Sequence, residues 1–145
     1  MIIYTIGFTK KSAEEFFETL RRSNARHLWD IRLHNTSQLA GFAKRDDLRY
    51  FLRQIVNMEY RDIPILAPEG SLLDDYRKTG DWAKYERNYL DLITRRCVSK
   101  HIDMPSLEDG VVLLCSEAEP DHCHRRLAAE YVARTIPANI HIKHL

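Results

Sequence analysis

The chain has 145 residues, and its 44% hydrophobic and 30% charged residues are typical of one globular domain large enough to fold without disulfides or a structural metal. With 22 Lys and Arg against 21 Asp and Glu, the net charge of +1 excludes the broad basic field of most duplex-DNA-binding proteins. No apolar run approaches the length of a membrane span and the first residues do not resemble a secretion signal, so we expect a single cytoplasmic α/β domain over residues 1–145, without membrane contact.

The first third of the chain alternates between strand and helix patterns. The β-branched and aromatic run Ile2–Phe8 predicts a buried strand. A helix follows it, in which Ser12 and Glu15 have the spacing of a capping box. A second strand is predicted from His27 to Arg32, and the polar stretch from Leu33 to Arg45 is long enough to be a functional loop.

The rest of the chain continues the alternation, with a loop through Pro105 before its most apolar strand. In chain order, the predicted elements are a helix over Leu48–Ile55, a strand over Tyr60–Leu66 interrupted by Pro64, helices over Ser71–Lys78 and from Asp81 to Arg96, the buried strand Val111–Cys115, a helix from Cys123 and a strand over Ile140–Leu145. The aromatic residues of the helix after Asp81 have core spacing, which is more typical of packing than of base stacking.

This alternation predicts an α/β fold with a mainly parallel sheet flanked by helices, a flavodoxin-like or Rossmann-like three-layer architecture. The strands Ile2–Phe8, His27–Arg32 and Val111–Cys115 are expected to be central neighbours, because their apolar runs suit burial on both faces. Ligands of such sheets bind beyond the carboxyl ends of the strands, where we expect one site. The polar residues at these ends are Gly7, Thr9, Asp30, Arg32, Cys115, Glu117 and the run Cys123-His124-Arg125-Arg126.

Several segments, spread over nearly the whole chain, resemble the domain-of-unknown-function 488 family. The most specific is Leu114-Cys115-Ser116-Glu117 followed by Cys123-His124-Arg125-Arg126; the others are Thr5-Ile6-Gly7-Phe8, Asp30-Ile31-Arg32, Ser37-Gln38-Leu39-Ala40-Gly41-Phe42, Leu66-Ala67-Pro68 and the final strand. Many members carry Gly-His-Ser where this chain has Gly7-Phe8-Thr9, so a histidine of that motif has no counterpart here. The resemblance implies the fold and the place of the site, but no established reaction.

The helix that begins near Cys123 favours an anion, because its first N–H groups are unpaired and its N-terminal end is partly positive. We therefore predict a pocket for a phosphate-bearing small molecule or a nucleic-acid end. Its ligand-binding residues would be Gly7, Thr9, Arg32, Cys115, Arg125 and Arg126. The alternative role for these arginines is a salt bridge to Asp30 or Glu117 that holds the strand ends together.

The candidate catalytic residues are Asp30, Glu117, Cys123 and His124. Cys123 begins a helix beside a histidine and two arginines, which favours its thiolate, so we expect it to react faster with alkylating agents than Cys97 or Cys115. Cys115, at the end of a buried strand, is expected to be a small core residue. Asp121 stands where a Cys-x₅-Arg phosphatase loop starting at Cys115 needs arginine, which argues against that mechanism.

Cys115, Glu117, Cys123 and His124 include residue types that bind zinc, but their spacing matches no standard zinc motif. We therefore expect no metal and no cofactor, and three free cysteines. The alternative to an enzyme-like domain is a non-catalytic nucleic-acid or protein adaptor, in which the same Asp, Arg, Cys and His residues form a structural network.

Overall fold

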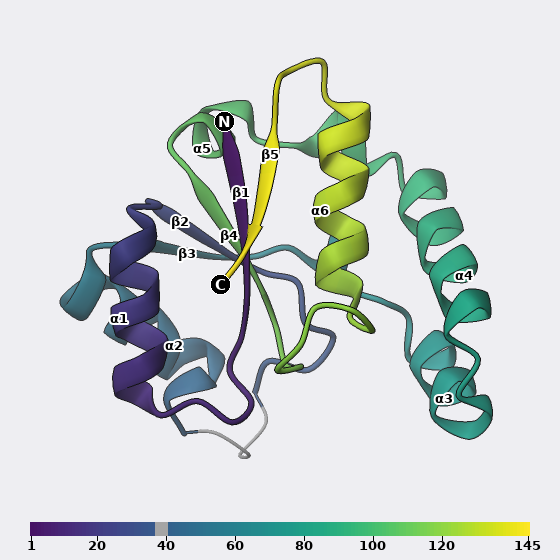
Figure 1. Cartoon of the computed structure of the whole chain (residues 1–145), viewed down its shortest axis with the longest axis horizontal. Helices are drawn as coiled ribbons and strands as arrows, with labels where there is room; N and C mark the ends of the chain where they lie inside the picture. The colour runs from purple at the N-terminus through teal and green to yellow at the C-terminus, as the bar shows by residue number, and fades with distance from the viewer. Residues whose placement is uncertain (37–40) are drawn as a thin grey trace.

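A computed structural model describes residues 1–36 and 41–145 and shows a parallel sheet between two layers of helices (Figure 1). Residues 37–40, which belong to the predicted functional loop and to one of the family-like segments, lie outside the described residues. None of the helices in the described ranges is long and apolar enough to cross a membrane.

The sheet has five strands, and its four strand pairs in the described residues are all parallel. They are β1 (Ile2–Gly7), β2 (His27–Asp30), β3 (Glu59–Asp62), β4 (Val111–Cys115) and β5 (His141–His144), in the order β3-β2-β4-β1-β5. The prediction that the first, second and fourth strands are central neighbours is therefore confirmed. Gly7 lies opposite Cys115 and Asp30 opposite Leu114, so these strand ends share one edge.

The helices lie on both faces of the sheet, as the three-layer prediction requires. They are α1 (Ala13–Ser23), α2 (Arg45–Phe51), α3 (Gly70–Thr79), α4 (Trp82–Arg95), α5 (Met104–Glu108) and α6 (His124–Thr135). Short 3₁₀-helices form η1 (Gly41–Ala43), η3 (Pro64–Leu66) and η4 (Val98–His101), and η2 (Leu52–Val56) is a π-helical turn. α1 and α2 cover one face, and α3, α4 and α6 lie on the other (Figure 1).

Two apolar cores follow from the alternation of side chains along the strands. In β4, Val112 and Leu114 pack with Phe16 and other apolar residues of α1 and α2. Val111 and Leu113 point to the opposite face, where they join residues of α4, α5 and α6. β4 is buried at all five positions, which explains why its sequence is continuously apolar.

Local signals account for most of the element boundaries. The Ser12 hydroxyl oxygen accepts the N–H of Glu15 at 3.1 Å, which caps α1. Pro64 cannot continue the third strand, so that strand ends at Asp62 and a turn begins. α5 and η4 lie where the sequence predicted only a loop, because each is too short to give a periodic pattern.

The connections after β2 and β4 leave toward opposite faces of the sheet, although these two strands are neighbours. The chain after β2 continues to α2, whereas the chain after β4 continues to α6 on the other face (Figure 1). Diverging connections open a crevice beyond the carboxyl ends of adjacent strands. The topology thus creates a place for a ligand between the ends of β2 and β4.

Candidate functional site

A cavity of about 190 Å³ lies at this edge of the sheet. Its wall combines basic, aromatic and sulfur-containing side chains from segments far apart in the sequence. Among its lining residues are Arg32, His34, Arg77 and His122, the aromatic residues Tyr76, Trp82 and Tyr85, and Cys115, Glu117, Cys123 and His124. The cavity therefore contains five of the ten residues that the sequence predicts for the site.

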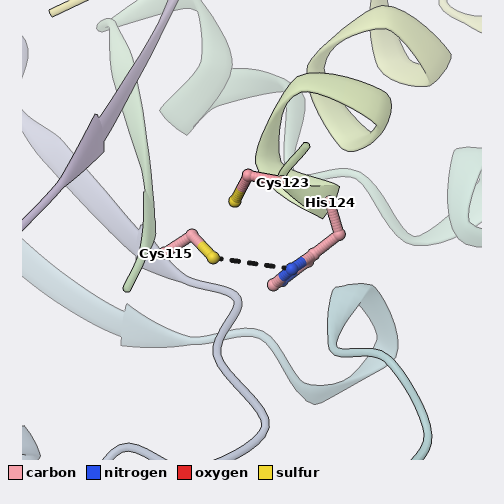
Figure 2. A group of neighbouring side chains, drawn as sticks. All are labelled: Cys115, Cys123 and His124. Carbon is pink, nitrogen blue, oxygen red and sulfur yellow. Dashed lines mark hydrogen bonds between the residues drawn. The ribbon is translucent and has the colours of Figure 1, made fainter. Parts of the chain in front are cut away.

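Cys115, Cys123 and His124 form a compact group at one side of the cavity (Figure 2). The Sγ atom of Cys115, at the end of β4, lies 3.5 Å from Nδ1 of His124, the first residue of α6. Cys123 is the N-cap of α6 and points its sulfur toward the same space. All three residues are buried.

The second ring nitrogen of His124 fixes the protonation of the imidazole. Nε2 lies 2.7 Å from the backbone carbonyl oxygen of Ile31, the residue after β2. Because a carbonyl oxygen can only accept a hydrogen bond, Nε2 must carry a proton. Nδ1 then faces Cys115 either as a second N–H donor or as a free lone pair.

The pKa values of the Cys115 and Cys123 thiols are shifted in opposite directions. A hydrogen bond from Cys123 lowers the pKa of Cys115 most strongly, and the charge of His124 lowers it further. Burial opposes both effects, but the pKa of Cys115 still lies well below its usual value. Burial and the neighbouring sulfur raise the pKa of Cys123. Burial alone would lower the pKa of His124, but the Cys115 thiolate raises it overall. The thiol with the lowered pKa is thus Cys115, which the sequence predicted to be a small core residue. Cys123 is buried and its pKa is raised, so the prediction of an open, reactive Cys123 is wrong.

The same three side chains are also the group in the described residues that could hold a metal ion. Their ligand atoms, two sulfurs and one imidazole nitrogen, all lie within 4.8 Å of one another. Thiolate and imidazole are ligands that zinc prefers. The sequence spacing did not indicate this, because the proximity of Cys115 to the start of α6 is a tertiary contact.

Asp30 and Arg32 form a buried ion pair beside the cavity. Nε and Nη2 of Arg32 donate to the two carboxylate oxygens of Asp30, at 2.8 and 2.7 Å. The hydroxyl of Tyr60 donates to the same carboxylate at 2.5 Å. The pKa of Tyr60 is raised, mainly by burial and next by this hydrogen bond to Asp30. Asp30 has no exposed surface and does not line the cavity, whereas Arg32 does.

Arg125 is fully buried and lies outside the cavity lining. Its Nη1 donates to the carbonyl oxygen of Glu117 and its Nη2 to that of Ala118, at 3.1 Å for the second bond. A Cβ atom on Gly7 would overlap the Glu117 carbonyl and press on the Arg125 guanidinium, so only glycine fits at the end of β1. Gly7 and Arg125 therefore hold the β4–α6 loop in place.

Thr9 and Arg126, which were also predicted to bind the ligand, lie outside the cavity lining. The Thr9 hydroxyl donates to the carbonyl oxygen of Ser116, which ties the β1–α1 loop to the β4–α6 loop. Arg126 forms surface ion pairs with Glu130 at 3.0 Å and with Glu86 at 3.5 Å. Glu117, by contrast, is exposed and contributes to the cavity wall.

The aromatic wall of the cavity is the part that the sequence did not predict. Trp82 stacks on Tyr85 with ring centroids 5.1 Å apart and on His122 with centroids 5.0 Å apart. Tyr85 and Tyr89 are core residues, as expected, but Trp82 is only partly buried. Only the position of His122, directly before Cys123, could have suggested its place in the site.

Comparison with protein families matches the chain to a domain of unknown function. Comparison with curated proteins and with solved structures gives no significant match. The family model covers residues 12–132, which include α1 and every residue that lines the cavity, the aromatic wall among them. The chain thus belongs to the family described as domain of unknown function DUF488.

Proposed function

We propose that the protein binds a small phosphate-bearing ligand, a nucleotide or a nucleic-acid end, in this cavity, and that Cys115, Cys123 and His124 are the reactive groups beside it. The observation that carries the proposal is the arrangement of Arg32. Arg32 lines the cavity and Asp30 fixes its guanidinium, yet Nη1 has no hydrogen-bond partner among the described residues.

Three contacts hold the Arg32 guanidinium. Nε and Nη2 are bound to Asp30, and the Phe8 ring lies 5.4 Å from the guanidinium carbon. Nη1 remains to donate to a ligand. A donor that is already fixed loses little conformational entropy when a phosphate binds, which favours affinity.

The remainder of the cavity wall suits the organic part of such a ligand. Tyr76 and Trp82 line the cavity and are only partly buried, so they present aromatic surface against which a nucleobase can pack. His34, Arg77 and His122 are exposed nitrogen-containing residues of the same wall. Aromatic and cationic groups around one crevice at the strand ends are typical of nucleotide sites.

One observation favours the alternative, a non-catalytic adaptor. Both predicted arginine ligands with buried side chains, Arg32 and Arg125, already have protein partners, a carboxylate and two carbonyl oxygens respectively. A structural network needs no more than this. The adaptor would bind long polyanions through its surface and would not respond to small phosphates.

Calorimetric titration with inorganic phosphate and with a mononucleotide tests the proposal. Arg32→Lys keeps the positive charge beside Asp30 but removes the planar guanidinium, which can donate to Asp30 and to a ligand at once. We expect this variant to weaken binding by about 1.5–3 kcal/mol. Arg77→Ala, at the exposed rim, should weaken it by roughly 0.2–1 kcal/mol. The matched control is Arg87→Ala, an exposed arginine of α4 that does not line the cavity.

Binding of both small ligands, with Arg87→Ala unchanged, supports the pocket. Equal weakening by Arg77→Ala and Arg87→Ala would instead indicate attraction by overall charge. Binding of long polyanions alone, with no heat from phosphate or the mononucleotide, favours the adaptor.

A further inference from the structure

We propose that Cys115, Cys123 and His124 bind a zinc ion whose fourth coordination position faces the cavity. The metal site itself stands independently of the proposed function. The role of the ion toward a phosphate-bearing ligand rests on that function.

The geometry of the three donor atoms supports this site. Ligands bound to tetrahedral zinc at ~2.3 Å for sulfur and ~2.1 Å for nitrogen lie roughly 3.6–3.8 Å from one another. The distance from Cys115 Sγ to His124 Nδ1 is 3.5 Å, and the whole set lies within 4.8 Å. Small rotations of the side chains therefore suffice to close the three donors around one ion.

His124 is oriented as histidine ligands of metals usually are. Its Nε2–H donates to the carbonyl oxygen of Ile31 at 2.7 Å, so Nδ1 is the nitrogen that faces Cys115 and would give its lone pair to the ion. A backbone carbonyl is a common partner for the distal nitrogen of a zinc-bound imidazole, because it fixes both the tautomer and the ring. This anchor comes from the end of β2, a different element from those that carry the ligands.

Charge and composition also fit zinc. Binding of Zn²⁺ displaces two protons to solvent, one from Cys123 and one from the Cys115–His124 pair, and the two thiolates then neutralise the ion in a buried site. All three donor groups of the cluster, two sulfurs and one imidazole nitrogen, would bind the ion, so the site accounts for the position of Cys123 beside Cys115 and His124. Soft sulfur with imidazole selects zinc over magnesium or calcium.

Three protein ligands with one open position are typical of catalytic zinc, since structural sites are closed by a fourth protein ligand. The cavity is the open side here, because all three ligand residues line it. A phosphate oxygen held by Arg32 in the same cavity could take the fourth position. The ion would then polarise the phosphoryl group as a Lewis acid.

The test begins with the zinc content of protein purified without chelator and without metal-affinity resin. We expect close to one zinc per chain in the wild type and in Cys97→Ser, a matched substitution at the exposed cysteine outside the cluster. Cys115→Ser, Cys123→Ser and His124→Asn should each retain roughly a tenth of this or less. Equal zinc loss in Cys97→Ser would overturn the assignment.

A second measurement on the wild type does not depend on whether the variants fold. Chelator-stripped protein, checked by circular dichroism, is titrated with Co²⁺, and we expect thiolate-to-cobalt charge-transfer absorption at one equivalent. Folded wild type with neither zinc nor this absorption overturns the metal site.

Phosphate titration of the same samples separates the two proposals. Zinc without phosphate binding contradicts only the proposed function, and phosphate binding without metal contradicts only the zinc site. A cobalt spectrum that does not shift at saturating phosphate overturns coordination of the ligand by the ion.

Discussion

At the scale of single residues, Arg125 and Arg126 show how strongly environment outweighs identity. They are adjacent at the start of α6 and both were candidates for anion binding. Arg125 is buried and donates to two loop carbonyl oxygens, whereas Arg126 is paired with Glu130 and Glu86 at the surface. The sequence could identify the pair but not which way each side chain points, because that depends on how α6 packs on the sheet.

Arg125→Ala should therefore act on stability. The loop carbonyls of Glu117 and Ala118 would lose their buried donors, which costs roughly 2–4 kcal/mol in the free energy of unfolding. Arg126→Ala should change it by less than about 1 kcal/mol. Urea denaturation of both variants measures the difference, and similar values for the two would contradict the structural role of Arg125.

The three thiols should differ in accessibility. Cys97 is exposed, while Cys115 and Cys123 are buried. We expect one thiol per chain to react rapidly with an aromatic disulfide reagent in native protein, and three after unfolding. Cys97→Ser should remove the rapid phase. Rapid labelling of Cys123 would instead support the open, positive surroundings that its sequence neighbours predicted.

At the scale of elements, the sequence predicts helices and strands whose signals lie in consecutive residues, and it misses contacts between separate elements. The capping box at Ser12 and the apolar run Val111–Cys115 predict α1 and β4, because a cap and a buried strand leave their pattern in consecutive residues. α5 has five residues and no such pattern. The site follows the same division. Cys115 and Arg32 follow strand patterns, so the sequence could predict that they lie at one edge of the sheet, and both line the cavity. The contact of His34 and His122 with the same cavity arises only when separate elements pack.

The junction between β1 and the β4–α6 loop gives a prediction at this scale. Gly7→Ala should destabilise the protein by about 1–3 kcal/mol, because the added methyl meets loop backbone that Arg125 holds in place. Gly70→Ala is the control: the new Cβ would meet only the Leu33 side chain, at 3.9 Å, and alanine favours the helix. Thermal denaturation compares them. A Gly7→Ala variant as stable as Gly70→Ala would show that the loop moves away without cost.

At the scale of the whole molecule, the strand order predicts how stability is distributed. β2, β4 and β1 each have two neighbours, whereas β3 and β5 are edges with largely exposed residues. Amide hydrogens of β4 should exchange most slowly, and those of β3 and β5 should exchange through local opening at much lower free energy. Hydrogen-exchange mass spectrometry tests this, and equal protection of β5 and β4 would contradict it.

The position of β1 in the sheet also has a consequence for how the protein is made. Ile3 pairs with Val111 and Ile2 with His141, so both neighbours of β1 leave the ribosome long after β1 itself. A nascent chain that has reached only β3 holds an apolar strand with no partner on either side, and such distant pairings form slowly. During synthesis Ile6 can already pack against Phe16 of α1, but the later partners of Ile3, such as Val111, emerge only with the second half of the chain.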